Sequence, residues 1–487
     1  MSCPMSLRTL LEGWRDDVPD LVLEGITLDS LQVRPGMAFL AVAGGKSHGL
    51  EFAAQAEAAG ASVVIHDGLF SVPALGIPCV EVPGLGHHLS SLASRFFHAP
   101  SEHLSISGIT GTNGKTSTAH FLAQGWHRAN GNAGLIGTLG SGPFGRLKPA
   151  RLTTPDPISL QQMLSQCVDD GVEHLAMEVS SHALAQGRCD DVRFEAGVFT
   201  NLSRDHLDYH GSMEGYAAAK RRLFADCKPR FGVINQDDAF GKKLIEEFSS
   251  SMEILSYGTN GSSEMRAAVS SMDSGGMTIR IEGPWGPGSV RSSLLGRFNV
   301  SNLIAAGGTL ALLGMDWRGV LHQMELMQPV PGRMHRLGGE RGQPVVVVDF
   351  AHTPDALEQA LQALRAHLHG RMVCVIGCGG DRDRGKRPMM ARVAESRCDT
   401  LIFTSDNPRF ESQDAIFADM VAGMTAREKA LLEPDRGEAI RRAVRGSGEG
   451  DIVLIAGKGH ETYQDLGDRR VPFSDEAAAL AALEAAA

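Results

Sequence analysis

Short apolar runs alternate with amphipathic stretches along most of this chain. In its middle part, four apolar runs and two amphipathic stretches stand out, at 104–110, 173–180, 194–203 and 229–236 and at 115–130 and 212–227. The apolar runs have the length of strands and the amphipathic stretches have the spacing of helices. Strands that alternate with helices predict a mostly parallel sheet covered by helices.

Both ends of the chain show the same alternation. Near the N-terminus, strand-like runs at 37–44 and 61–67 flank an alanine-rich helical stretch at 52–61. In the C-terminal part, four apolar runs each end in polar residues, within 343–368, 371–381, 398–409 and 450–461. The last residues, 475–487, predict a helix. The segment from about 252 to 295 differs, because its short alternating runs separated by glycines predict a small antiparallel excursion.

Two proline-containing segments mark the expected boundaries. Pro100 lies in the predicted linker 96–107, and the segment 327–337 contains two prolines and a glycine. The pattern therefore predicts an α/β protein with three domains, at 1–100, 101–330 and 331–487. In sheets of this class, ligands bind beyond the carboxyl ends of the strands, which is where the polar residues fall.

Composition narrows the class of protein. The 487 residues are too many for one ordinary core, and 43% hydrophobic and 21% charged residues are typical of a soluble globular protein. The formal charge of −11 argues against nucleic acid as the main partner. The eight cysteines form no CxxC pair, the first residues do not resemble a signal peptide, and no apolar stretch approaches membrane-spanning length. We therefore expect a cytoplasmic protein with reduced thiols and no membrane insertion.

The stretch "GTNGKT", residues 111–116, lies between a predicted strand and a predicted helix. Its glycines let main-chain amides approach phosphate oxygens, and the start of the helix adds partial positive charge. Lys115 would reach the terminal phosphates, and the Thr116 hydroxyl would bind Mg²⁺. The loop is shorter than the common GxxxxGK[ST] form, since Ile109 stands where that form has a glycine. The strand–loop–helix context favours a phosphate-binding loop over an incidental glycine turn.

Two further polar clusters follow predicted strands. Glu178 ends one strand, and His206 lies in "FTNLSRDHLDYHG" after the next. A strand-end carboxylate and a histidine are suitable Mg²⁺ ligands beside a nucleotide. Lys220 lies on the helix that comes next, and its pattern alone indicates an ordinary solvated lysine.

Taken together, these motifs resemble those of a known family. "TGTNGKT", "EVSSHAL", "NLSRDHLDYHG", "YAAAKRRLF", "RFNVSN", "PGRMHRL", "VDFAHTPDAL", "GCGGDRDRGKRPMM", "SDNPR" and "GKGHE" occur in the order found in the Mur ligases of peptidoglycan synthesis. The resemblance covers nearly the whole chain. It implies a central P-loop ATPase-like parallel sheet flanked by an N-terminal α/β substrate domain and a C-terminal Rossmann-like domain.

The C-terminal motifs are similar to those of the members that add meso-2,6-diaminopimelate to UDP-N-acetylmuramoyl-L-alanyl-D-glutamate. In these members the side-chain carboxylate of D-glutamate is phosphorylated by ATP, and an amine of meso-diaminopimelate then attacks the acyl phosphate. The resemblance implies ATP and Mg²⁺ as the requirements of the reaction. We expect these small molecules as the partners of a monomer, with no nucleic acid and no membrane insertion.

The resemblance also assigns residues to each ligand. For ATP the matching positions are Gly111, Thr112, Asn113, Gly114, Lys115, Thr116, Asn299, Arg333 and Asp349. For the UDP-muramoyl dipeptide they are Leu28, Ser30, Gly45, Lys46, Ser47, Thr153, Thr154, Ser180, Gln186 and Arg188. For diaminopimelate they are Arg382, Asp406, Asn407, Pro408, Arg409, Gly457 and Glu461.

The catalytic and metal-binding positions implied by the resemblance overlap. The catalytic set is Lys115, Glu178, His206 and Lys220, and the magnesium set is Thr116, Glu178, His206 and Lys220. Lys220 matches a lysine that family members carry as a carbamate (N6-carboxylysine), which would change a cation into an anionic oxygen ligand.

Two positions depart from the family pattern, and both lie in the N-terminal domain. Leu31 stands where the family usually has arginine, and His48 stands where it usually has aspartate. The departures therefore fall among the positions that the resemblance assigns to the uridine end of the substrate.

Three alternatives stay open at this stage. A lysine-adding ligase of the same fold would have no use for Arg409, because lysine lacks the distal carboxylate. The region before the phosphate loop and the "DNPR" stretch argue against a folylpolyglutamate synthase-like ligase. The presence of Lys115, Glu178, His206 and Lys220 disfavours an ATP-dependent switch or scaffold without ligase activity.

Overall fold

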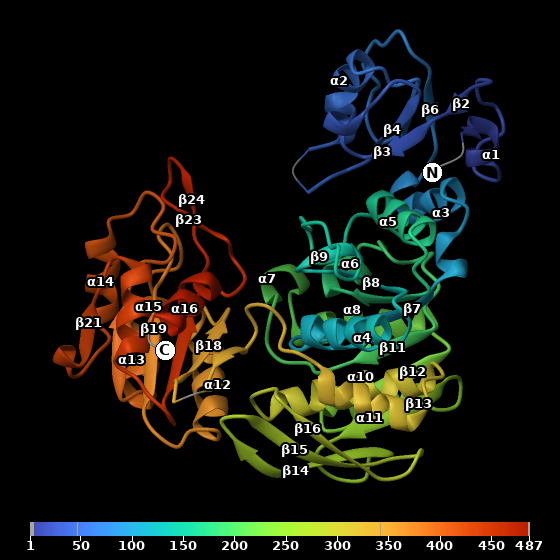
Figure 1. The fold of residues 1–487 in the computed structure, drawn as a ribbon. Coiled ribbons are helices and arrows are strands. Elements are labelled where there is room, and N and C mark those ends of the chain that lie inside the picture. Colours follow the sequence, from blue (N-terminus) through green and yellow to red (C-terminus); the bar gives the residue numbers. More distant parts are fainter. Residues whose placement is uncertain (1–3, 46, 341, 486–487) are drawn as a thin grey trace. The chain divides into compact units, whose positions relative to one another are not determined.

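The computed structural model describes residues 4–45, 47–340 and 342–485. The chain divides into two compact units, residues 1–263 with 305–315, and residues 264–304 with 316–487 (Figure 1). Helix α10 (Phe298–Leu312) contributes residues to both units. Lys46, one of the residues expected to bind the UDP-muramoyl dipeptide, lies outside the described residues.

The first unit begins with a small parallel sheet in the order β3-β4-β5-β6. Its elements are β1 (Met5–Ser6), α1 (Leu7–Leu11), β2 (Val22–Leu23), β3 (Gly25–Thr27), η1 (Ser30–Gln32), β4 (Met37–Ala41), η2 (Gly49–Phe52), α2 (Ala53–Ala58), β5 (Val63–His66), β6 (Cys79–Glu81), α3 (Leu85–Phe96) and η3 (Pro100–His103). Alternate residues of β4 enter different cores, because successive side chains of a strand point to opposite faces. Leu40 joins the core with α1 and α3, whereas Phe39 packs with α2.

The larger sheet of the first unit has the order β13-β12-β11-β7-β10-β8-β9. Its strands are β7 (Ser105–Thr110), β8 (Ala133–Gly137), β9 (Gly140–Pro143), β10 (His174–Glu178), β11 (Ala196–Phe199), β12 (Phe231–Asn235) and β13 (Glu253–Gly258). All neighbouring pairs are parallel except β8 with β9. This confirms the mostly parallel sheet and the four strands expected in this part of the chain.

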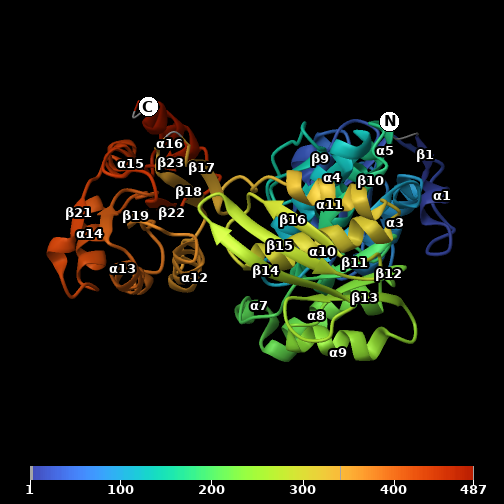
Figure 2. The same cartoon turned by 60° about the horizontal axis from the view of Figure 1, so that its bottom comes forward.

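Helices cover both faces of this sheet. They are α4 (Lys115–Asn130), α5 (Pro157–Asp169), α6 (Ser181–Ala185), α7 (Leu207–His210), α8 (Met213–Ala225) and α9 (Ala239–Phe248). α8 and α9 lie on one face, and α4 lies on the other (Figures 1 and 2). Helix α4 has the bounds predicted from the sequence, and Gly131 ends it in a left-handed conformation that glycine adopts readily.

The second unit begins with an antiparallel sheet in the order β16-β15-β14. Its strands are β14 (Met265–Asp273), β15 (Gly276–Glu282) and β16 (Gly288–Ser292), and α11 (Trp317–Leu326) packs against β16. The antiparallel excursion is thus confirmed, but its predicted start near 252 is wrong. β13 still pairs in parallel with β12, because its buried residues 255–258 continue the parallel sheet.

The C-terminal sheet has the order β17-β18-β22-β19-β20-β21. Its strands are β17 (His335–Gly338), β18 (Val345–Asp349), β19 (Met372–Ile376), β20 (Thr400–Phe403), β21 (Ala430–Leu432) and β22 (Ile452–Ala456). All neighbouring pairs are parallel except β17 with β18. A separate hairpin is formed by β23 (Tyr463–Asp465) and β24 (Arg470–Pro472).

Helices cover both faces of the C-terminal sheet as well. They are α12 (Pro354–Arg365), α13 (Lys386–Arg397), α14 (Gln413–Val421), α15 (Arg436–Arg445) and α16 (Asp475–Glu484), with the short η4 (Arg427–Lys429). Val347 and the other β18 residue on the same face of the sheet pack with α12 to α14. Val346 and the other residue on the opposite face pack with α15 and α16. This two-sided burial explains the unbroken "VVVV" of β18, which a half-exposed strand would not have.

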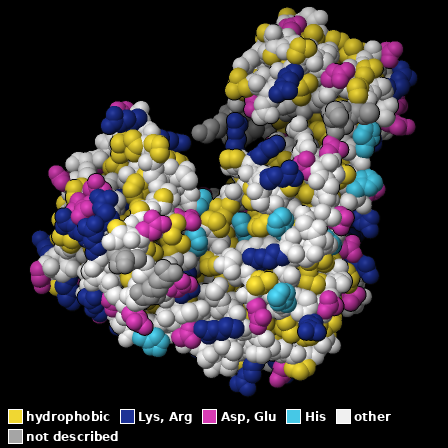
Figure 3. All heavy atoms as spheres, in the orientation of Figure 1, with side chains coloured by type: hydrophobic (Ala, Val, Ile, Leu, Met, Phe, Trp, Pro, Cys, Tyr) yellow, Lys and Arg dark blue, Asp and Glu magenta, His cyan; other side chains and the backbone are white. Residues whose placement is uncertain are grey.

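The face of the molecule drawn in Figure 3 carries charges of both signs. On the face drawn in Figure 3, basic and acidic side chains alternate over short distances in each unit. No described helix has the length and apolar character needed to span a bilayer. Each of the seven cysteines that the structure describes is a free thiol, as expected.

Candidate active site

The phosphate loop connects β7 to α4 in the first unit. Gly111 has φ +148°, and a Cβ there would collide with the hydroxyl of Thr200, so the position requires glycine. Gly114 has φ +85° and directly precedes the first residue of α4. The loop is supported by the segment after β11, since Asn113 N donates to Asn201 Oδ1 at 3.0 Å and Thr200 Oγ1 donates to Asn113 O at 2.6 Å. A rigid loop with amides at a helix start is the arrangement that binds phosphate.

Lys115 folds back over this loop. Its Nζ donates to the carbonyl oxygens of Gly111 at 2.8 Å and Thr112 at 2.9 Å. These are main-chain oxygens of the loop itself, so the ammonium group is held where the loop would receive a phosphate. The position suits a cation that binds terminal phosphates.

Glu178, at the end of β10, is the centre of a polar network. Its Oε2 accepts from Thr116 Oγ1 at 2.8 Å, and its Oε1 accepts from Thr138 N at 2.8 Å. Glu178 is almost completely buried, 1% exposed. Since β10 lies between β7 and β8, the parallel register brings its last residue beside both the phosphate loop and the residue after β8.

Five of the residues expected to bind the UDP-muramoyl dipeptide belong to the same network. Thr154 Oγ1 donates to Glu178 O at 2.9 Å and accepts from Ser180 N at 3.0 Å, and Thr153 Oγ1 lies 3.1 Å from Thr138 Oγ1. The guanidinium group of Arg188 donates to Thr154 O at 2.7 Å and to Gln186 Oε1 at 2.6 and 2.9 Å. These expected contacts thus adjoin the expected metal ligand.

Lys220 is a buried lysine, not the solvated one that its pattern indicated. It is 1% exposed, and its Nζ donates to Gly111 O at 2.7 Å. Burial lowers the pKa of Lys220 to about 6, and the nearby positive charge of Lys115 adds to the shift. A large part of this amine is therefore neutral at pH 7, and the neutral amine is the form that adds CO₂.

His206 lies apart from Thr116 and Glu178 in its contacts. It adopts φ +51°, its side chain is 47% exposed, and its ring meets that of His182 edge-on at 4.8 Å. Among the described residues, no group of three or more His, Cys, Asp and Glu side chains is close enough to hold a metal ion. Thr116 and Glu178 nevertheless offer oxygen atoms, the donor type that Mg²⁺ prefers.

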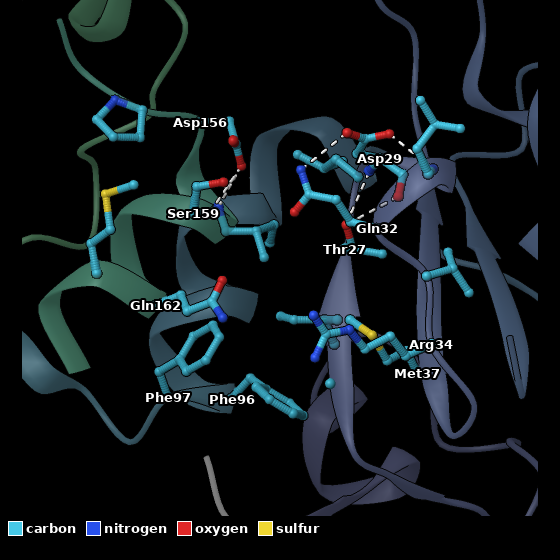
Figure 4. A pocket seen from close by; sticks show the side chains of 18 of the residues that line it. Thr27, Asp29, Gln32, Arg34, Met37, Phe96, Phe97, Asp156, Ser159 and Gln162 are labelled. Atoms are coloured by element: carbon cyan, nitrogen blue, oxygen red, sulfur yellow. Dashed lines mark hydrogen bonds between the residues drawn. The ribbon is translucent and has the colours of Figure 1, made fainter. Parts of the chain in front are cut away.

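A cavity of about 900 Å³ opens in the first unit, between the segment after β3 and the helices α3 and α5. Figure 4 shows Asp29, Gln32 and Arg34 on one side and Phe96, Phe97 and Gln162 on the other. Leu28, one of the expected substrate contacts, lines it. The wall formed by residues 149–152 leads directly to Thr153 and Thr154, so the cavity and the Glu178 network are joined along the chain.

The remaining expected N-terminal contacts lie around this sheet. Ser30 Oγ donates to Gln55 Oε1 at 3.0 Å, while Gly45 and Ser47 lie in the loop after β4. The two departures from the family pattern differ in their surroundings. Leu31 is 80% exposed and lines the cavity, whereas His48 is buried, with Nε2 3.0 Å from Asp67 Oδ1. His48 thus has a structural partner within its own domain.

In the second unit, the residues expected to bind diaminopimelate follow three neighbouring parallel strands. Arg382 comes after β19, Asp406 to Arg409 after β20, and Gly457 and Glu461 after β22. Asn407 Nδ2 donates to Glu461 Oε2 at 2.9 Å. A Cβ placed on Gly379 would lie 3.2 Å from Arg409 Nη1 and 3.7 Å from Arg382 Cγ, so both arginine side chains lie close to this glycine. Pro408 O lies against Gly380, where a Cβ would collide with it.

The protonation and backbone of this region are unusual. Desolvation raises the pKa of Asp406, which is 8% exposed, despite the opposing charges of Arg436 and Lys458. Arg409 adopts φ +50°, a conformation that costs energy for a residue other than glycine. Its side chain donates to Gly380 O at 2.7 Å and its Nε lies 3.8 Å from Asp465 Oδ2.

The three remaining ATP positions also lie in the second unit. Asn299 is buried and engaged locally, with Nδ2 donating to Leu295 O at 2.8 Å. Asp349 ends β18 and accepts from Met334 N at 2.7 Å, and desolvation raises its pKa. Arg333 stacks its guanidinium group on Phe350, 5.0 Å from the ring centroid.

Comparison with known proteins gives matches along most of this chain. Three family profiles match successive segments: "Mur ligase family, catalytic domain" at 22–97, "Mur ligase middle domain" at 109–310, and "Mur ligase, glutamate ligase domain" at 332–459. A relative from Pseudomonas aeruginosa is 47% identical over 485 residues and is called UDP-N-acetylmuramoyl-L-alanyl-D-glutamate–2,6-diaminopimelate ligase. The match covers 99% of each chain. The chain belongs to the Mur ligase family.

Solved structures extend the comparison. A structure titled as UDP-N-acetylmuramoyl-L-alanyl-D-glutamate–2,6-diaminopimelate ligase matches with a TM-score of 0.76 and 34% identity, over 99% of both chains. Folylpolyglutamate synthase from Mycobacterium tuberculosis, complexed with ADP and AMPPCP, has a TM-score of 0.59 at 19% identity. It covers 76% of this chain and 92% of its own. This second match shows a shared fold alone.

Several residues of this Mur ligase contact the expected site although no role was predicted for them from the sequence. Thr138 donates its amide and its hydroxyl to Glu178, Tyr209 OH accepts from Gln186 Nε2, and Tyr216 OH lies 3.2 Å from Thr112 Oγ1. Thr138 could have been predicted from the sequence, because it is a polar residue directly after a buried strand. The two tyrosines lie in motifs in which roles were predicted for other residues.

Proposed function

We propose that this Mur ligase joins meso-2,6-diaminopimelate to the D-glutamate of UDP-N-acetylmuramoyl-L-alanyl-D-glutamate, with ATP converted to ADP and phosphate. The observation that carries the proposal is the combination of acidic and basic groups beyond β19, β20 and β22 in the second unit. Arg382 and Arg409 suit carboxylates, while Asp406 and Glu461 suit ammonium groups. Diaminopimelate carries both kinds of group at each end.

The proposed chemistry has two steps. An oxygen of the D-glutamate side-chain carboxylate bonds to the γ-phosphorus as the bond from phosphorus to ADP breaks. The diaminopimelate amine then bonds to the acyl carbon, phosphate leaves, and the amine loses a proton. Phosphorylation is needed because a carboxylate is a poor electrophile. Positioning and neutralisation of charge account for most of the catalysis.

The first unit supplies the groups for phosphoryl transfer in this proposal. Lys115 and the amides of the phosphate loop bind the terminal phosphates, since they converge on one loop. Thr153, Thr154, Ser180, Gln186 and Arg188 hold the peptide end of the nucleotide sugar beside Glu178, and the cavity near Leu28 accommodates its nucleotide end. In the second unit, Asn299, Arg333 and Asp349 are the proposed contacts to the nucleotide.

We also propose a magnesium requirement. Thr116, Glu178, His206 and a carbamate of Lys220 would hold Mg²⁺, which neutralises phosphate charge when bound. The hydroxyl of Thr116 and the carboxylate of Glu178 already lie 2.8 Å apart, and both are oxygen donors. We further propose that the protein acts as a monomer in the cytoplasm.

The product of the reaction tests the proposal. The protein is incubated with UDP-N-acetylmuramoyl-L-alanyl-D-glutamate, ATP and one amino acid from a panel, and the product mass is measured. We expect one added residue with meso-diaminopimelate, one ADP per product, and no product without ATP. A lysine adduct formed at an equal rate would instead indicate the lysine-adding reaction. Hydrolysis of ATP without any adduct would contradict the ligase function.

A further inference from the structure

Lys458 is a completely buried ammonium group in the second unit, within "GKGHE" directly after β22. Its side chain has no exposed surface. Its Nζ donates to Glu461 Oε2 at 2.9 Å and to Asn407 Oδ1 at 3.0 Å, and it lies 3.5 Å from Asp406 Oδ1. Three of the residues proposed to bind the amino acid thus share one cation, to which the sequence analysis gave no role.

The contacts of Lys458 determine how the Asn407 amide is oriented. Asn407 Oδ1 accepts from Lys458 Nζ and also from Asp465 N at 2.9 Å, so both of its lone pairs are used. Its Nδ2 must therefore point the other way, where it donates to Glu461 Oε2 at 2.9 Å. Without the lysine, the amide would lose one of the two donors that fix this orientation.

The same contacts also orient the Glu461 carboxylate. Oε2 is held by Lys458 and Asn407, whereas Oε1 accepts no hydrogen bond within the part of the chain that the structure describes. Burial acts to raise the pKa of Glu461, but the hydrogen bonds from Lys458 and Asn407 outweigh it and leave the pKa below its ordinary value. The side chain is 23% exposed, so Oε1 is within reach of a ligand.

We propose that Lys458 is a positioning residue for the amino-acid substrate: it fixes Asn407 and Glu461 so that Oε1 of Glu461 receives a substrate ammonium group. The inference rests on the proposed function, because it assigns a role within the same site. The alternative is that Lys458 is only a structural ion-pair partner. A buried ion pair is weak evidence for stability by itself, since apolar replacements of similar volume are often tolerated.

The test compares four proteins: wild type, Lys458→Met, Glu461→Gln and the double variant. Methionine keeps the unbranched shape of lysine and removes its charge and donors. We expect Lys458→Met to raise KM for meso-diaminopimelate about tenfold or more, equivalent to 1.4 kcal/mol, with KM for ATP and for the UDP-muramoyl dipeptide unchanged. In the Glu461→Gln background the same substitution should change KM by less than about threefold, because its effect acts through Glu461.

Several controls separate the outcomes. Lys429→Met, on an exposed residue of η4, should leave all three KM values unchanged. If Lys458→Met does not fold, as judged by its thermal transition, Lys458→Gln, which retains a donor, takes its place. An equal rise of all three KM values, or the same factor in both backgrounds, would overturn the positioning role. If the wild type makes no diaminopimelate adduct, the proposed function fails; if it does and Lys458→Met retains its KM, only this inference fails.

Discussion

Lys115 and Lys220 donate to the same acceptor, the main-chain carbonyl oxygen of Gly111, at 2.8 and 2.7 Å. One lysine starts α4 and the other lies in the middle of α8, so the tertiary structure brings two basic groups to one oxygen of the phosphate loop. Two ammonium groups that share one hydrogen-bond acceptor repel each other, and this repulsion favours a neutral amine at the more buried Lys220. In the proposed function, the pair would thus combine a phosphate-binding cation with an amine able to react with CO₂.

Replacement of Lys115 tests the phosphate loop. Lys115→Ala should fold but lose ligation by about 100-fold or more, because the developing charge on the phosphates loses its main cationic contact. The measurement is the rate of ADP formation with both other substrates present. Lys242→Ala, on an exposed residue of α9, is the matched control and should retain wild-type turnover. Turnover near that of the wild type in Lys115→Ala would sink the phosphate-loop assignment.

Replacement of Lys220 tests the carbamate. Lys220→Ala should lower the ligase activity by about 100-fold or more, because it removes one charged group from the reacting centre. Added short carboxylic acids should partly restore activity, since they can supply the missing oxygens in the space left by the side chain. ¹³C NMR after addition of labelled bicarbonate should show a carbamate signal in the wild type alone. An active alanine variant that carboxylic acids do not affect would refute the carbamate.

The selectivity for meso-diaminopimelate is predicted to depend on Arg409. A bidentate, partly desolvated pair of arginine and carboxylate contributes about 2 to 5 kcal/mol when its loss strands a charge. Each 1.4 kcal/mol is about tenfold, so the wild type should prefer meso-diaminopimelate over L-lysine in kcat/KM by about thirtyfold or more. Arg409→Ala should raise KM for meso-diaminopimelate strongly and leave KM for ATP almost unchanged. Equal kcat/KM for both amino acids in the wild type would show that Arg409 does not bind the distal carboxylate selectively.

His120, a buried residue of α4, is predicted to make stability depend on pH. Burial lowers its pKa to about 4, and its Nε2 has no hydrogen-bond partner in the described structure. Between pH 4 and 6.5 the unfolded chain binds more protons than the folded chain, so stability is lost as the pH falls through this range. From pH 7.5 to 5, the free energy of unfolding of the wild type should fall by about 2 kcal/mol more than that of His120→Leu. If urea titrations show the same change of the free energy of unfolding with pH in both proteins, this prediction is wrong.

The sequence by itself determined the features that depend on local pattern. Periodicity and the glycines at both ends fixed α4 to the residue, because a helix start and stop are decided by neighbouring residues. The strand–helix alternation gave the parallel sheets, since parallel strands need a crossover connection. The order of the motifs also identified the family, which the full-length match to relatives confirmed.

Only the tertiary structure decided which polar groups share a site. Thr138 contacts Glu178 because β8 and β10 are neighbours in parallel register, and no local pattern encodes which strands pair. Lys220 looked like a surface lysine on its helix, yet packing against the phosphate loop buries it. Lys458 likewise gains its acceptors Asp406 and Asn407 from the end of another strand. Burial and charge pairing arise between segments far apart in the chain, so the surroundings of these residues follow from the fold and not from their neighbours in the sequence.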